Sequence, residues 1–578
     1  MHNKVPLLDV KDLKVTFLSK GKEFSAVNGI SFHVNNGETL GILGESGSGK
    51  SVSALSVLRL LPASSAFVSG KILFTWSGDS VVNLVNLPER EIQNIRGNRI
   101  SMIFQEPMTS LNPVISCGKQ VMESILQHQK ISIVEAKEKT MNWFMEVQLQ
   151  RPGSIFGSYP HQLSGGQRQR VMIAMAMACF PSLIIADEPT TALDVTVQKT
   201  ILDLIKNLQE KYRMAILFIT HDIGVISQIA GRIAVMQKGI IVEDGNVKSV
   251  LNQPQHPYTK GLMACRPPLD KRPLHLLTVN DYLTLKIPEA DHLSFSEDGS
   301  IPESGRKRRL QEMYSHAPFL EIKNLSKWFS SGKSFFGKSR GLVKAVDDVS
   351  FVVYKGESVG LIGESGSGKT TLGRTILKLI DSNAGDVIYN GVSLVSLSRK
   401  ETRKFRKKIQ IIFQDPYSSL NPRITIGEAI SEPIRVHKTR NDGVDVKNKV
   451  FDLLFKVGFD DSYYNSYPHE LSGGQRQRVV IARALATSPE FIICDEPVSA
   501  LDVSIQAMVL NLLNSLKKEF SLTFIFISHD LAVVKFMCDR MIVMNNGKIE
   551  ETGESDYLYY NPASDYTRKL IGSVPVIK

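Results

Sequence analysis

Residues 44–51 read Gly44-Glu45-Ser46-Gly47-Ser48-Gly49-Lys50-Ser51, and residues 363–370 repeat the pattern as Gly363-Glu364-Ser365-Gly366-Ser367-Gly368-Lys369-Thr370. Each stretch follows a short apolar segment typical of a strand and precedes a segment typical of a helix. Such glycines let backbone N–H groups surround phosphates at a helix N-terminus, while the lysine neutralises phosphate charge and the next hydroxyl reaches Mg²⁺. The two stretches therefore predict two phosphate-binding loops in an α/β fold.

A second pair of matching segments shows that the chain is duplicated. Leu163-Ser164-Gly165-Gly166-Gln167 recurs 308 residues later as Leu471-Ser472-Gly473-Gly474-Gln475. The same offset relates three further pairs, namely Glu188 and Glu496, His221 and His529, and Tyr258-Thr259 and Tyr566-Thr567. A period of domain size that occurs twice indicates a tandem duplication. We predict a first domain at residues 1–265 and a second at 319–578.

Residues 266–318 are predicted to be the linker, because prolines interrupt this stretch and its periodicity fades. It contains the basic run Arg306-Lys307-Arg308-Arg309. We interpret this run as solvated, with contact to an anionic membrane face as the less favoured alternative.

Two apolar segments end in paired carboxylates, Asp187-Glu188 and Asp495-Glu496. Buried parallel strands deliver such side chains to the carboxyl edge of a sheet. Asp187 and Asp495 are therefore expected to hold Mg²⁺, and Glu188 and Glu496 to orient or deprotonate an attacking water.

His221 and His529 each follow another apolar segment, 33 residues after the glutamate of the acid pair. A lone histidine at such a place is more often structural. Its repetition at the same distance favours a contact with a γ-phosphate in each half.

Bulk composition narrows the function classes only a little. A net charge of +11 and a pI near 9.1 favour anionic partners without choosing among them. Five scattered cysteines form no CxxC pair, which argues against zinc sites or disulfides and fits a reduced cytosolic compartment. The first ten residues lack the apolar run of a signal peptide, and no apolar stretch reaches the length of a membrane span. We expect the protein to remain inside the cell.

Together these motifs resemble ABC-type ATPase domains over nearly the whole chain apart from the linker. The LSGGQ segments that begin at Leu163 and Leu471 are the most specific markers. The resemblance implies two tandem P-loop NTPase domains, each with a mainly parallel sheet core, an antiparallel β subdomain and a helical subdomain that carries the signature. It also implies that the halves meet head to tail, so that the signature residues of one half cover the ATP of the other.

The family pattern assigns further roles by position. Gln105 and Gln414 match the glutamines that contact Mg²⁺ and water, and Asp194 and Asp502 match the D-loop. The signature residues expected at the nucleotide are Ser164, Gly165, Gly166, Gln167, Ser472, Gly473, Gly474 and Gln475. Phe17 and Phe329 are candidates to stack on adenine, and Phe24 and Trp328 are the alternatives.

A finer resemblance is to the ATPases of oligopeptide and dipeptide importers. It rests on residues 105–113, residues 414–422 and His256-Pro257-Tyr258-Thr259. It implies an ATP-binding and ATP-hydrolysing subunit that uses ATP and Mg²⁺ to energise import of short peptides, with nickel or glutathione-like cargo as alternatives. The implied partners are two transmembrane permease subunits and an extracytoplasmic substrate-binding protein, and the implied location is the cytoplasmic face of the inner membrane. Some relatives carry an iron–sulfur cluster after this segment, but Cys265 stands alone, so we expect none.

Two other classes fit less well. Soluble tandem ABC proteins that act on the ribosome have a long helical linker, whereas this linker is broken by prolines, and those that act on DNA insert cysteine-rich zinc modules, which this chain lacks. No nucleic acid partner is therefore expected. A non-catalytic scaffold is disfavoured because both halves keep the lysine, acid pair, signature and histidine.

Overall fold

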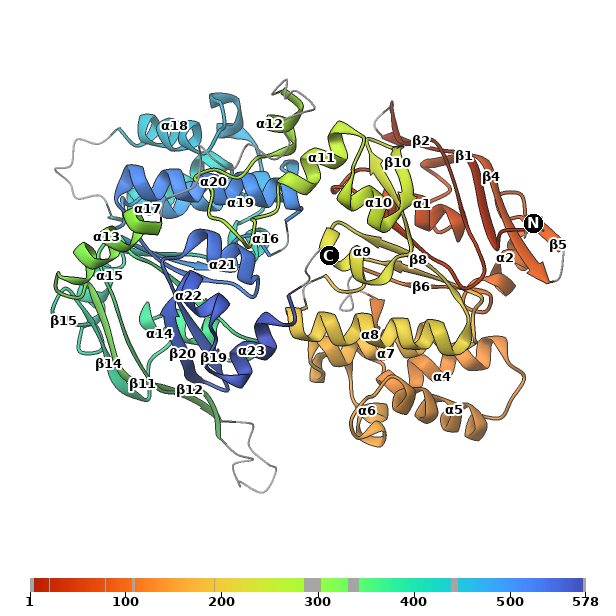
Figure 1. The fold of residues 1–578 in the computed structure, drawn as a ribbon, viewed down its shortest axis with the longest axis horizontal. Coiled ribbons are helices and arrows are strands. Elements are labelled where there is room, and N and C mark those ends of the chain that lie inside the picture. Colours follow the sequence, from red (N-terminus) through yellow and green to blue (C-terminus); the bar gives the residue numbers. More distant parts are fainter. Residues whose placement is uncertain are drawn as a thin grey trace. The chain divides into compact units, whose positions relative to one another are not determined.

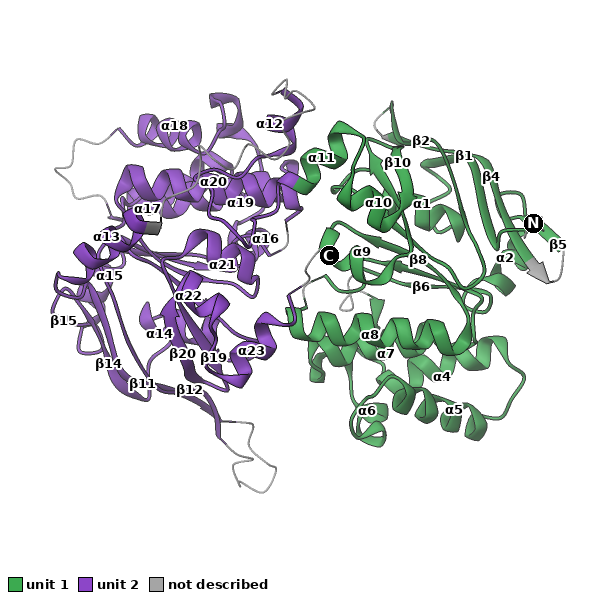
Figure 2. Ribbon diagram, viewed as in Figure 1, with its two compact units in different colours: residues 1–263, 575–578 green, residues 264–574 purple. Residues whose placement is uncertain are grey.

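The computed structural model describes residues 5–19, 21–77, 80–105, 110–191, 193–284, 303–330, 342–437, 445–499 and 501–574. The chain divides into two compact units, formed by residues 1–263 and residues 264–574 (Figures 1 and 2). Each unit contains one six-stranded and one four-stranded sheet. The prediction of two tandem α/β domains is confirmed.

The six-stranded sheet of the first unit has the order β10-β9-β3-β8-β7-β6. Its strands are β3 (Thr39–Leu43), β6 (Ile100–Ile103), β7 (Leu183–Asp187), β8 (Ala215–Thr220), β9 (Arg232–Gln237) and β10 (Ile240–Asn246). Every pairing is parallel except that of β9 with β10. All residues of β3, β7 and β8 are buried, as expected for parallel strands covered on both faces.

An antiparallel sheet of order β2-β1-β4-β5 accompanies this core. Its strands are β1 (Leu8–Ser19), β2 (Lys22–Val34), β4 (Ala66–Ser77) and β5 (Ser80–Asn83). Side chains from both sheets share one apolar cluster with α1 (Lys50–Val57) and α2 (Glu89–Ile95). The two elements that flank the phosphate-binding loop, β3 and α1, both contribute to this cluster.

Helices inserted between β6 and β7 form the predicted helical part. They are α4 (Cys117–His128), α5 (Ile133–Glu146), α6 (Pro152–Gly157), the short 3₁₀ helix η1 (Pro160–Gln162) and α7 (Gly165–Met177). Figure 1 shows α4, α5 and α6 grouped beside α7. Buried residues of α7 belong to the same apolar cluster as buried residues of α8 (Val195–Tyr212) and α9 (Ile223–Ile229). The unit ends with α10 (Val247–Asn252) and α11 (Pro257–Ala264).

The second unit repeats this plan. Its main sheet has the order β16-β17-β18-β13-β19-β20, and its antiparallel sheet the order β12-β11-β14-β15. The strands are β11 (Leu320–Ser330), β12 (Leu342–Val353), β13 (Ser358–Ile362), β14 (Ala384–Tyr389), β15 (Val392–Ser393), β16 (Ile409–Ile412), β17 (Phe491–Asp495), β18 (Thr523–Ile527), β19 (Arg540–Asn545) and β20 (Lys548–Glu554).

The helices of this unit occupy the corresponding places in the chain. They are α14 (Lys369–Ile376), α15 (Arg399–Phe405), α16 (Pro416–Ser419), α17 (Ile426–His437), α18 (Val446–Lys456), η4 (Asp461–Asn465), η5 (Pro468–Glu470), α19 (Gly473–Leu485), α20 (Val503–Phe520), α21 (Leu531–Met537), α22 (Ser555–Tyr560) and α23 (Asp565–Ile571).

The segment expected to be the linker contributes α12 (Val279–Thr284) and α13 (Glu303–Tyr314) to the second unit, while residues 285–302 lie outside the described residues. Arg306 in α13 is only 8% exposed and pairs with Glu554 and Asp556. The interpretation of the basic run as solvated is therefore wrong for Arg306. The two carboxylates, supplied by a part of the chain about 250 residues away, make burial of its charge possible.

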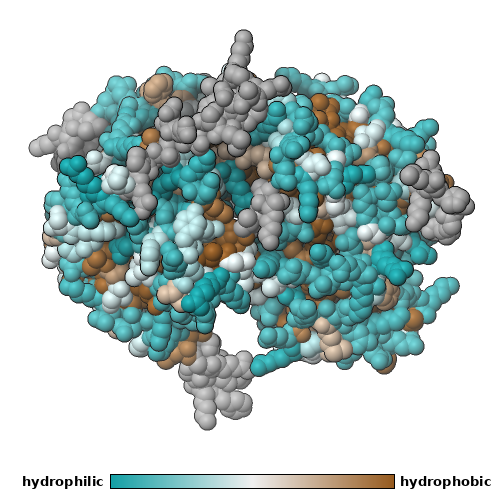
Figure 3. Space-filling model, in the orientation of Figure 1, coloured by the Kyte–Doolittle hydropathy of each residue, from teal (hydrophilic) through white to brown (hydrophobic). Residues whose placement is uncertain are grey.

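Helices of the described residues are all too short or too polar to cross a membrane. The face of the molecule drawn in Figure 3 is mainly hydrophilic, and its apolar side chains form scattered groups. Scattered groups of this kind are normal on protein surfaces and do not by themselves mark a binding site.

Candidate active sites

Both predicted phosphate-binding loops lead directly into a helix. Helix α1 begins at Lys50 after Gly49 with φ 102°, and α14 begins at Lys369 after Gly368 with φ 105°. A Cβ atom at Gly49 would lie 2.6 Å from the carbonyl oxygen of Ala26. Only glycine fits this combination of left-handed backbone and close approach. The loop therefore presents its N–H groups at the positive end of the helix dipole.

The lysine of each loop is buried and bonded inside its own loop. Lys50 Nζ donates to the carbonyl oxygens of Gly44 at 2.7 Å and Glu45 at 2.8 Å. In the second unit, Lys369 Nζ donates to those of Gly363 and Glu364 at the same distances. These contacts fix the charged lysine ammonium group within each phosphate-binding loop.

The hydroxyl that follows each lysine meets the first carboxylate of the acid pair. Ser51 Oγ donates to Asp187 Oδ1 at 3.0 Å, and Thr370 Oγ1 donates to Asp495 Oδ1 at 2.9 Å. Burial, assisted by the neighbouring Glu188 charge, raises the pKa of Asp187 to about 6. Burial also raises the pKa of Asp495, again with help from the neighbouring glutamate. Each site thus joins a hydroxyl and a buried carboxyl at the end of a central strand.

Oxygen atoms of this kind suit Mg²⁺, which usually binds through one or two carboxylates together with water and substrate phosphates. No cluster of three or more histidine, cysteine, aspartate or glutamate side chains arranged for a metal occurs among the described residues. The oxygen pair at each site fits an ion that the nucleotide helps to hold, rather than a cage made by protein alone.

Glu188 lies at the centre of a hydrogen-bond network. Its carboxylate accepts from Gln105 Nε2 at 3.0 Å and from Thr191 Oγ1 at 3.0 Å, and its Oε1 lies 3.0 Å from His221 Nδ1. Burial acts to raise the pKa of Glu188, but the hydrogen bond and charge of His221 outweigh it, so the pKa is lowered. An ionised carboxylate fixed in this way can orient or accept a proton from a water molecule.

Glu496 has the same surroundings in the second unit. Gln414 Nε2 donates to its Oε2 at 2.9 Å, and His529 Nδ1 lies 3.3 Å from that oxygen. Burial opposes ionisation of both partners, yet their mutual hydrogen bond and charge lower the pKa of Glu496 and raise that of His529. The structure thus brings together, in each half, the predicted loop, acid pair, glutamine and histidine.

The backbone at both glutamates is strained. Glu188 has φ 47° and Glu496 has φ 49°, in the left-handed region that residues other than glycine rarely adopt. Such strain costs on the order of 1 kcal/mol and clusters at functional positions. Positive φ also recurs at other equivalent positions, such as Arg213 and Ser521, so the repetition reflects the duplication, and the functional reading of these glutamates rests on their hydrogen-bond networks.

The signature segments lie at helix starts. Ser164 and Gln167 form a reciprocal capping box at the start of α7, and Ser472 and Gln475 form the same box at α19. The fourth residue of each segment, Gly166 or Gly474, packs closely against the next long helix. A Cβ at Gly166 would lie 2.8 Å from Val197 Cγ1, and one at Gly474 would lie 2.3 Å from Ile505 Cγ2.

Asp194 and Asp502 stand at the N-termini of α8 and α20, and the Asp194 side chain accepts from the Val197 N–H at 2.9 Å. Ala192 and Ala500, two positions before these aspartates, lie outside the described residues, and so do residues 106–109 of the first glutamine segment. The nucleotide-contacting roles of the signature and D-loop residues stay predictions.

The aromatic candidates lie on the first two strands of each antiparallel sheet. Phe17 on β1 is partly buried against the core and stands opposite Phe24 on β2, which is 63% exposed. Phe329 on β11 is 41% exposed with the Lys327 ammonium over its ring, and its neighbour Trp328 is contacted by Lys344. Which ring stacks on adenine stays a prediction.

Sequence reasoning gave no role to two tyrosines that contact the loops. Tyr258 OH accepts from the Glu45 N–H at 3.2 Å and lies 3.3 Å from Glu45 Oε2, while Tyr566 OH accepts from the Glu364 N–H at 3.0 Å. The 308-residue offset had already paired the two tyrosines, but nothing in the sequence indicated that either reaches a phosphate-binding loop.

Each tyrosine is carried by a segment that a glutamate anchors. Glu243 of β10 accepts from the N–H groups of Gln255 and His256, and Glu551 of β20 accepts from those of Ala563 and Ser564. The two anchored segments differ in sequence just before the tyrosine, yet each directs a tyrosine hydroxyl to the second residue of a loop.

Two family models match the chain. The ABC transporter model matches residues 27–191 and again residues 346–499. The model of the oligopeptide/dipeptide transporter C-terminal region matches residues 242–289, which include the segment that carries Tyr258.

Curated relatives match over almost the full length. A glutathione import ATP-binding protein of Salmonella choleraesuis is 44% identical over 571 residues, which cover 99% of this chain and 90% of that protein. The proteins of the same description from Escherichia coli O6:H1 and Pectobacterium atrosepticum are 44% and 43% identical with the same coverage.

Solved structures match one half at a time. The dimeric structure of a bacterial ABC transporter cassette covers 41% of this chain and 98% of its own, with 30% identity and a TM-score of 0.37. The structure of cbiO1 from Clostridium perfringens, part of an ABC transporter complex, covers 43% of this chain and 92% of its own, with 26% identity and a TM-score of 0.38.

Proposed function

This chain belongs to the ABC transporter family and is the ATP-hydrolysing subunit of a peptide-type importer, and from that premise we propose that both of its sites hydrolyse ATP to drive uptake of short peptides. The observation that carries the proposal is the matched set of contacts in the two halves. Each half has a buried lysine in its loop, a hydroxyl on the first carboxylate, and a second carboxylate held by a glutamine and a histidine. Neither half has lost a part.

Lys50 and Lys369 would neutralise the β- and γ-phosphates within their loops. Ser51 and Thr370 would hold Mg²⁺ together with Asp187 and Asp495, and Gln105 and Gln414 would complete its surroundings. The ion, when bound, neutralises charge that develops on the transferred phosphoryl group. Because the pKa of Asp187 is about 6, most of its carboxyl is already ionised at neutral pH and available as a ligand.

Glu188 and Glu496 act on the attacking water. Each carboxylate is ionised and is held in place by a glutamine and a histidine. It can therefore orient the water and accept its proton without rearranging. His221 and His529 keep these carboxylates in place and present a second ring nitrogen for a γ-phosphate. Thr191 supplies a third contact to the Glu188 carboxylate, and the equivalent Ser499 donates to the Glu496 carbonyl oxygen and helps to lower the pKa of the Glu496 carboxyl.

The family resemblance supports a further assignment for the signature segments. We expect Ser472, Gly473 and Gly474 to cover ATP bound by the first half, and Ser164, Gly165 and Gly166 to cover ATP bound by the second. Closure would then bring helix N-terminal N–H groups to the γ-phosphate and link hydrolysis to a movement that a membrane partner can sense.

The permease partners follow from the importer role, and their number and the further partners belong to the proposal. We propose two permease subunits, an extracytoplasmic substrate-binding protein that acts through them, and peripheral attachment to the inner face of the cytoplasmic membrane. Fractionation of cells with and without the permeases tests this point. A chain that leaves the membrane fraction only when the permeases are absent is the expected result, and one that never enters that fraction would contradict it.

For the cargo, we propose short peptides, with the tripeptide glutathione as the first to test because the 44%-identical relatives are described as glutathione import proteins. A deletion strain that requires an amino acid should fail to grow on di- to hexapeptides, or on glutathione as sole sulfur source. Wild-type chain should restore growth, and the Glu188→Gln/Glu496→Gln chain should not. Normal growth of the deletion strain on all these sources, with loss of nickel uptake, would overturn the cargo assignment.

A further inference from the structure

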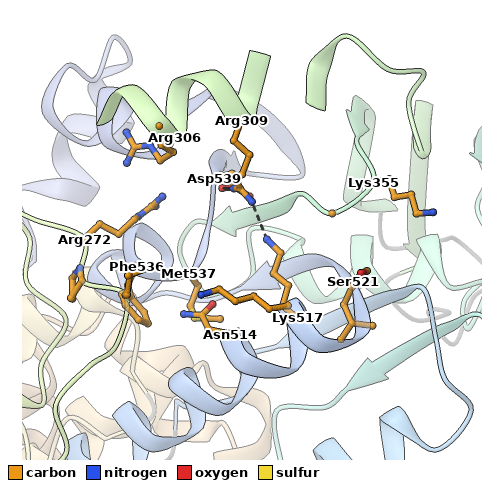
Figure 4. Close-up of a pocket in the computed structure, with 16 residues that line it drawn as sticks. Arg272, Arg306, Arg309, Lys355, Asn514, Lys517, Ser521, Phe536, Met537 and Asp539 are labelled. Carbon is orange, nitrogen blue, oxygen red and sulfur yellow. Dashed lines mark hydrogen bonds and ion pairs between the residues drawn. The ribbon is translucent and has the colours of Figure 1, made fainter. Parts of the chain in front are cut away.

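A cavity of about 550 Å³ lies within the second unit, between α13, the chain before α12, the C-terminal half of α20 and the end of α21. Figure 4 shows Arg306 and Arg309 on α13 across this space from Asn514 and Lys517 on α20 and from Ser521 just after that helix. Its volume falls in the range of ligand sites, roughly 300–1,000 Å³. None of the residues proposed for ATP binding lines it.

The cavity wall is strongly cationic. It contains Arg272, Arg306, Arg309, Lys355, Lys517 and Lys518, against one carboxylate, Asp539. Arg309 and Lys517 share that carboxylate, and the charge of Arg306 is offset by two acids outside the cavity. Lys355 and Lys518 are exposed, and of the two only Lys355 has a nearby acid, Glu490, whose pKa its charge helps to lower. The wall therefore carries surplus positive charge.

Two of the guanidinium groups lack part of their hydrogen bonding. Arg272 donates from Nη2 to the carbonyl oxygens of Lys535 and Cys538, but its Nε is buried and has no partner among the described residues. The buried Nε of Arg306 is in the same condition. Buried donors in proteins are nearly always satisfied, so these two mark polar groups that lack compensation in this wall. Both Nε atoms are closed off from solvent, and Arg168, Arg232 and Arg476 show the same feature elsewhere, so they are not donors that a molecule in the cavity can reach.

Crowding of like charges also indicates that the cavity wall carries surplus positive charge. Burial lowers the pKa of Arg272 and of Lys517, and although Asp539 opposes this, the neighbouring Arg306 and Arg309 charges add to the lowering. An anion in the cavity would relieve this repulsion. Apolar side chains of Leu522, Phe536 and Met537 form another part of the wall, so a purely hydrated ion does not match the whole surface.

We propose that this cavity is a binding site for a small phosphate-bearing anion, separate from the two ATP sites. Guanidinium groups recognise phosphate oxygens with paired, charge-assisted hydrogen bonds, and the half-exposed Arg309 and the exposed Lys355 and Lys518 supply the donors. The anion is either a free phosphate compound, whose organic part contacts the apolar wall, or the headgroup of a phospholipid. Both sources share the phosphate chemistry that the wall fits.

Inorganic pyrophosphate is the first probe, titrated by calorimetry into the full chain carrying Lys50→Ala and Lys369→Ala, which weaken phosphate binding at the two loops. We expect saturable binding of one pyrophosphate per chain. The pair Arg309→Glu/Lys518→Glu should weaken it by roughly tenfold or more, because attraction becomes repulsion at two positions. The control pair is Lys271→Glu/Arg308→Glu, which makes the same charge change at exposed neighbours outside the cavity and should change affinity by less than about twofold.

Vesicles of phosphatidylglycerol provide the second arm. Vesicle binding that is lost in the Arg309/Lys518 pair, retained in the control pair and displaced by pyrophosphate would identify a lipid headgroup as the source. Equal weakening by both pairs in either arm would show general surface charge and overturn the proposal. No saturable binding of either probe would overturn it as well.

Thermal unfolding checks that each variant folds. If the Arg309/Lys518 pair does not fold, the single change Lys518→Gln removes one exposed charge, and a loss of affinity of about threefold is expected. An unchanged affinity in that variant counts against the site. Because the ATP sites are disabled throughout, failure here leaves the proposed transport function untouched.

Discussion

Removing one hydroxyl group, by Tyr258→Phe, should weaken ATP binding at the first site. The ring of Tyr258 is 1% exposed, so phenylalanine fits the same space and only the contact with the loop is lost. That contact is the hydrogen bond from the Glu45 N–H at 3.2 Å, with Glu45 Oε2 at 3.3 Å as a second partner. The change therefore tests whether the segment that carries Tyr258 holds the phosphate-binding loop in its binding conformation.

The size of the effect follows from the two distances. A hydrogen bond of ordinary length contributes about 0.5–1.5 kcal/mol, and these bonds are long, while Glu45 is only half-buried, so that water can partly replace the lost partner. We expect a loss of about 1 kcal/mol. If all of it appears as disorder of the loop, ATP affinity falls about fivefold.

The assay is a titration with ATP in a chain that also carries Lys369→Ala, so that binding reports mainly the first site. Tyr212→Phe, at the end of α8 and outside the site, serves as the matched control. Tyr566→Phe in a Lys50→Ala background makes the equivalent test of the second site, where the bond to Glu364 is 3.0 Å long. Unchanged ATP affinity and unfolding temperature for both site tyrosines would refute a role in holding the loops.

Three further outcomes can be checked separately. Glu188→Gln and Glu496→Gln should each keep ATP binding but slow hydrolysis at the substituted site by roughly 100-fold. The measurement is the ATPase rate in the reconstituted transporter. Near-normal turnover in one variant would show that its site is regulatory. The pKa of His529 is raised in the folded protein, so its pair with Glu496 stabilises the fold fully below about pH 6.5 and loses that effect as the pH rises through the folded pKa. His529→Gln should therefore lower the unfolding temperature more at pH 6 than at pH 9. An equal loss at both pH values would contradict this. Gly474→Ala should lower the free energy of unfolding by about 1–3 kcal/mol, and by more than Gly166→Ala does, because its new methyl group lies closer to the facing helix. Thermal unfolding measures both variants, and the reverse order would argue against this reason.

Much of each site could be predicted because its parts are local in sequence. A phosphate-binding loop is one continuous segment, and Asp187 and Glu188 follow directly from a buried strand whose end lies at a known edge of a parallel sheet. The hydrogen bonds of Gln105 and His221 to Glu188 were not predicted, since these two residues reach the glutamate from other strands. Hydrogen bonds between distant segments leave no periodic pattern in a sequence.

Other features depend on long-range packing and were beyond sequence reasoning. The contact of Tyr258 with Glu45 joins residues 213 positions apart, and the offset that paired the tyrosines says nothing of their partner. The burial of Arg306 depends on acids near the C-terminus of the second half. The left-handed backbone at Glu188 is likewise set by surrounding structure, because its residue type gives no such preference.

The attachment of the linker segment to the second half bears on how such a gene can be divided. Arg306 and Arg309 pair with carboxylates of β20, α22 and the residue before β19, and Arg272 donates to carbonyls at the end of α21. A split at residue 318 would remove Arg309 from Asp539, which is 4% exposed, and leave that carboxylate with Lys517 and the Ser358 N–H. Loss of one partner from a buried charge pair destabilises strongly. Fission of the gene into two working cistrons is therefore expected to place the new start codon near Ala264, so that the segment is inherited with the second ATPase.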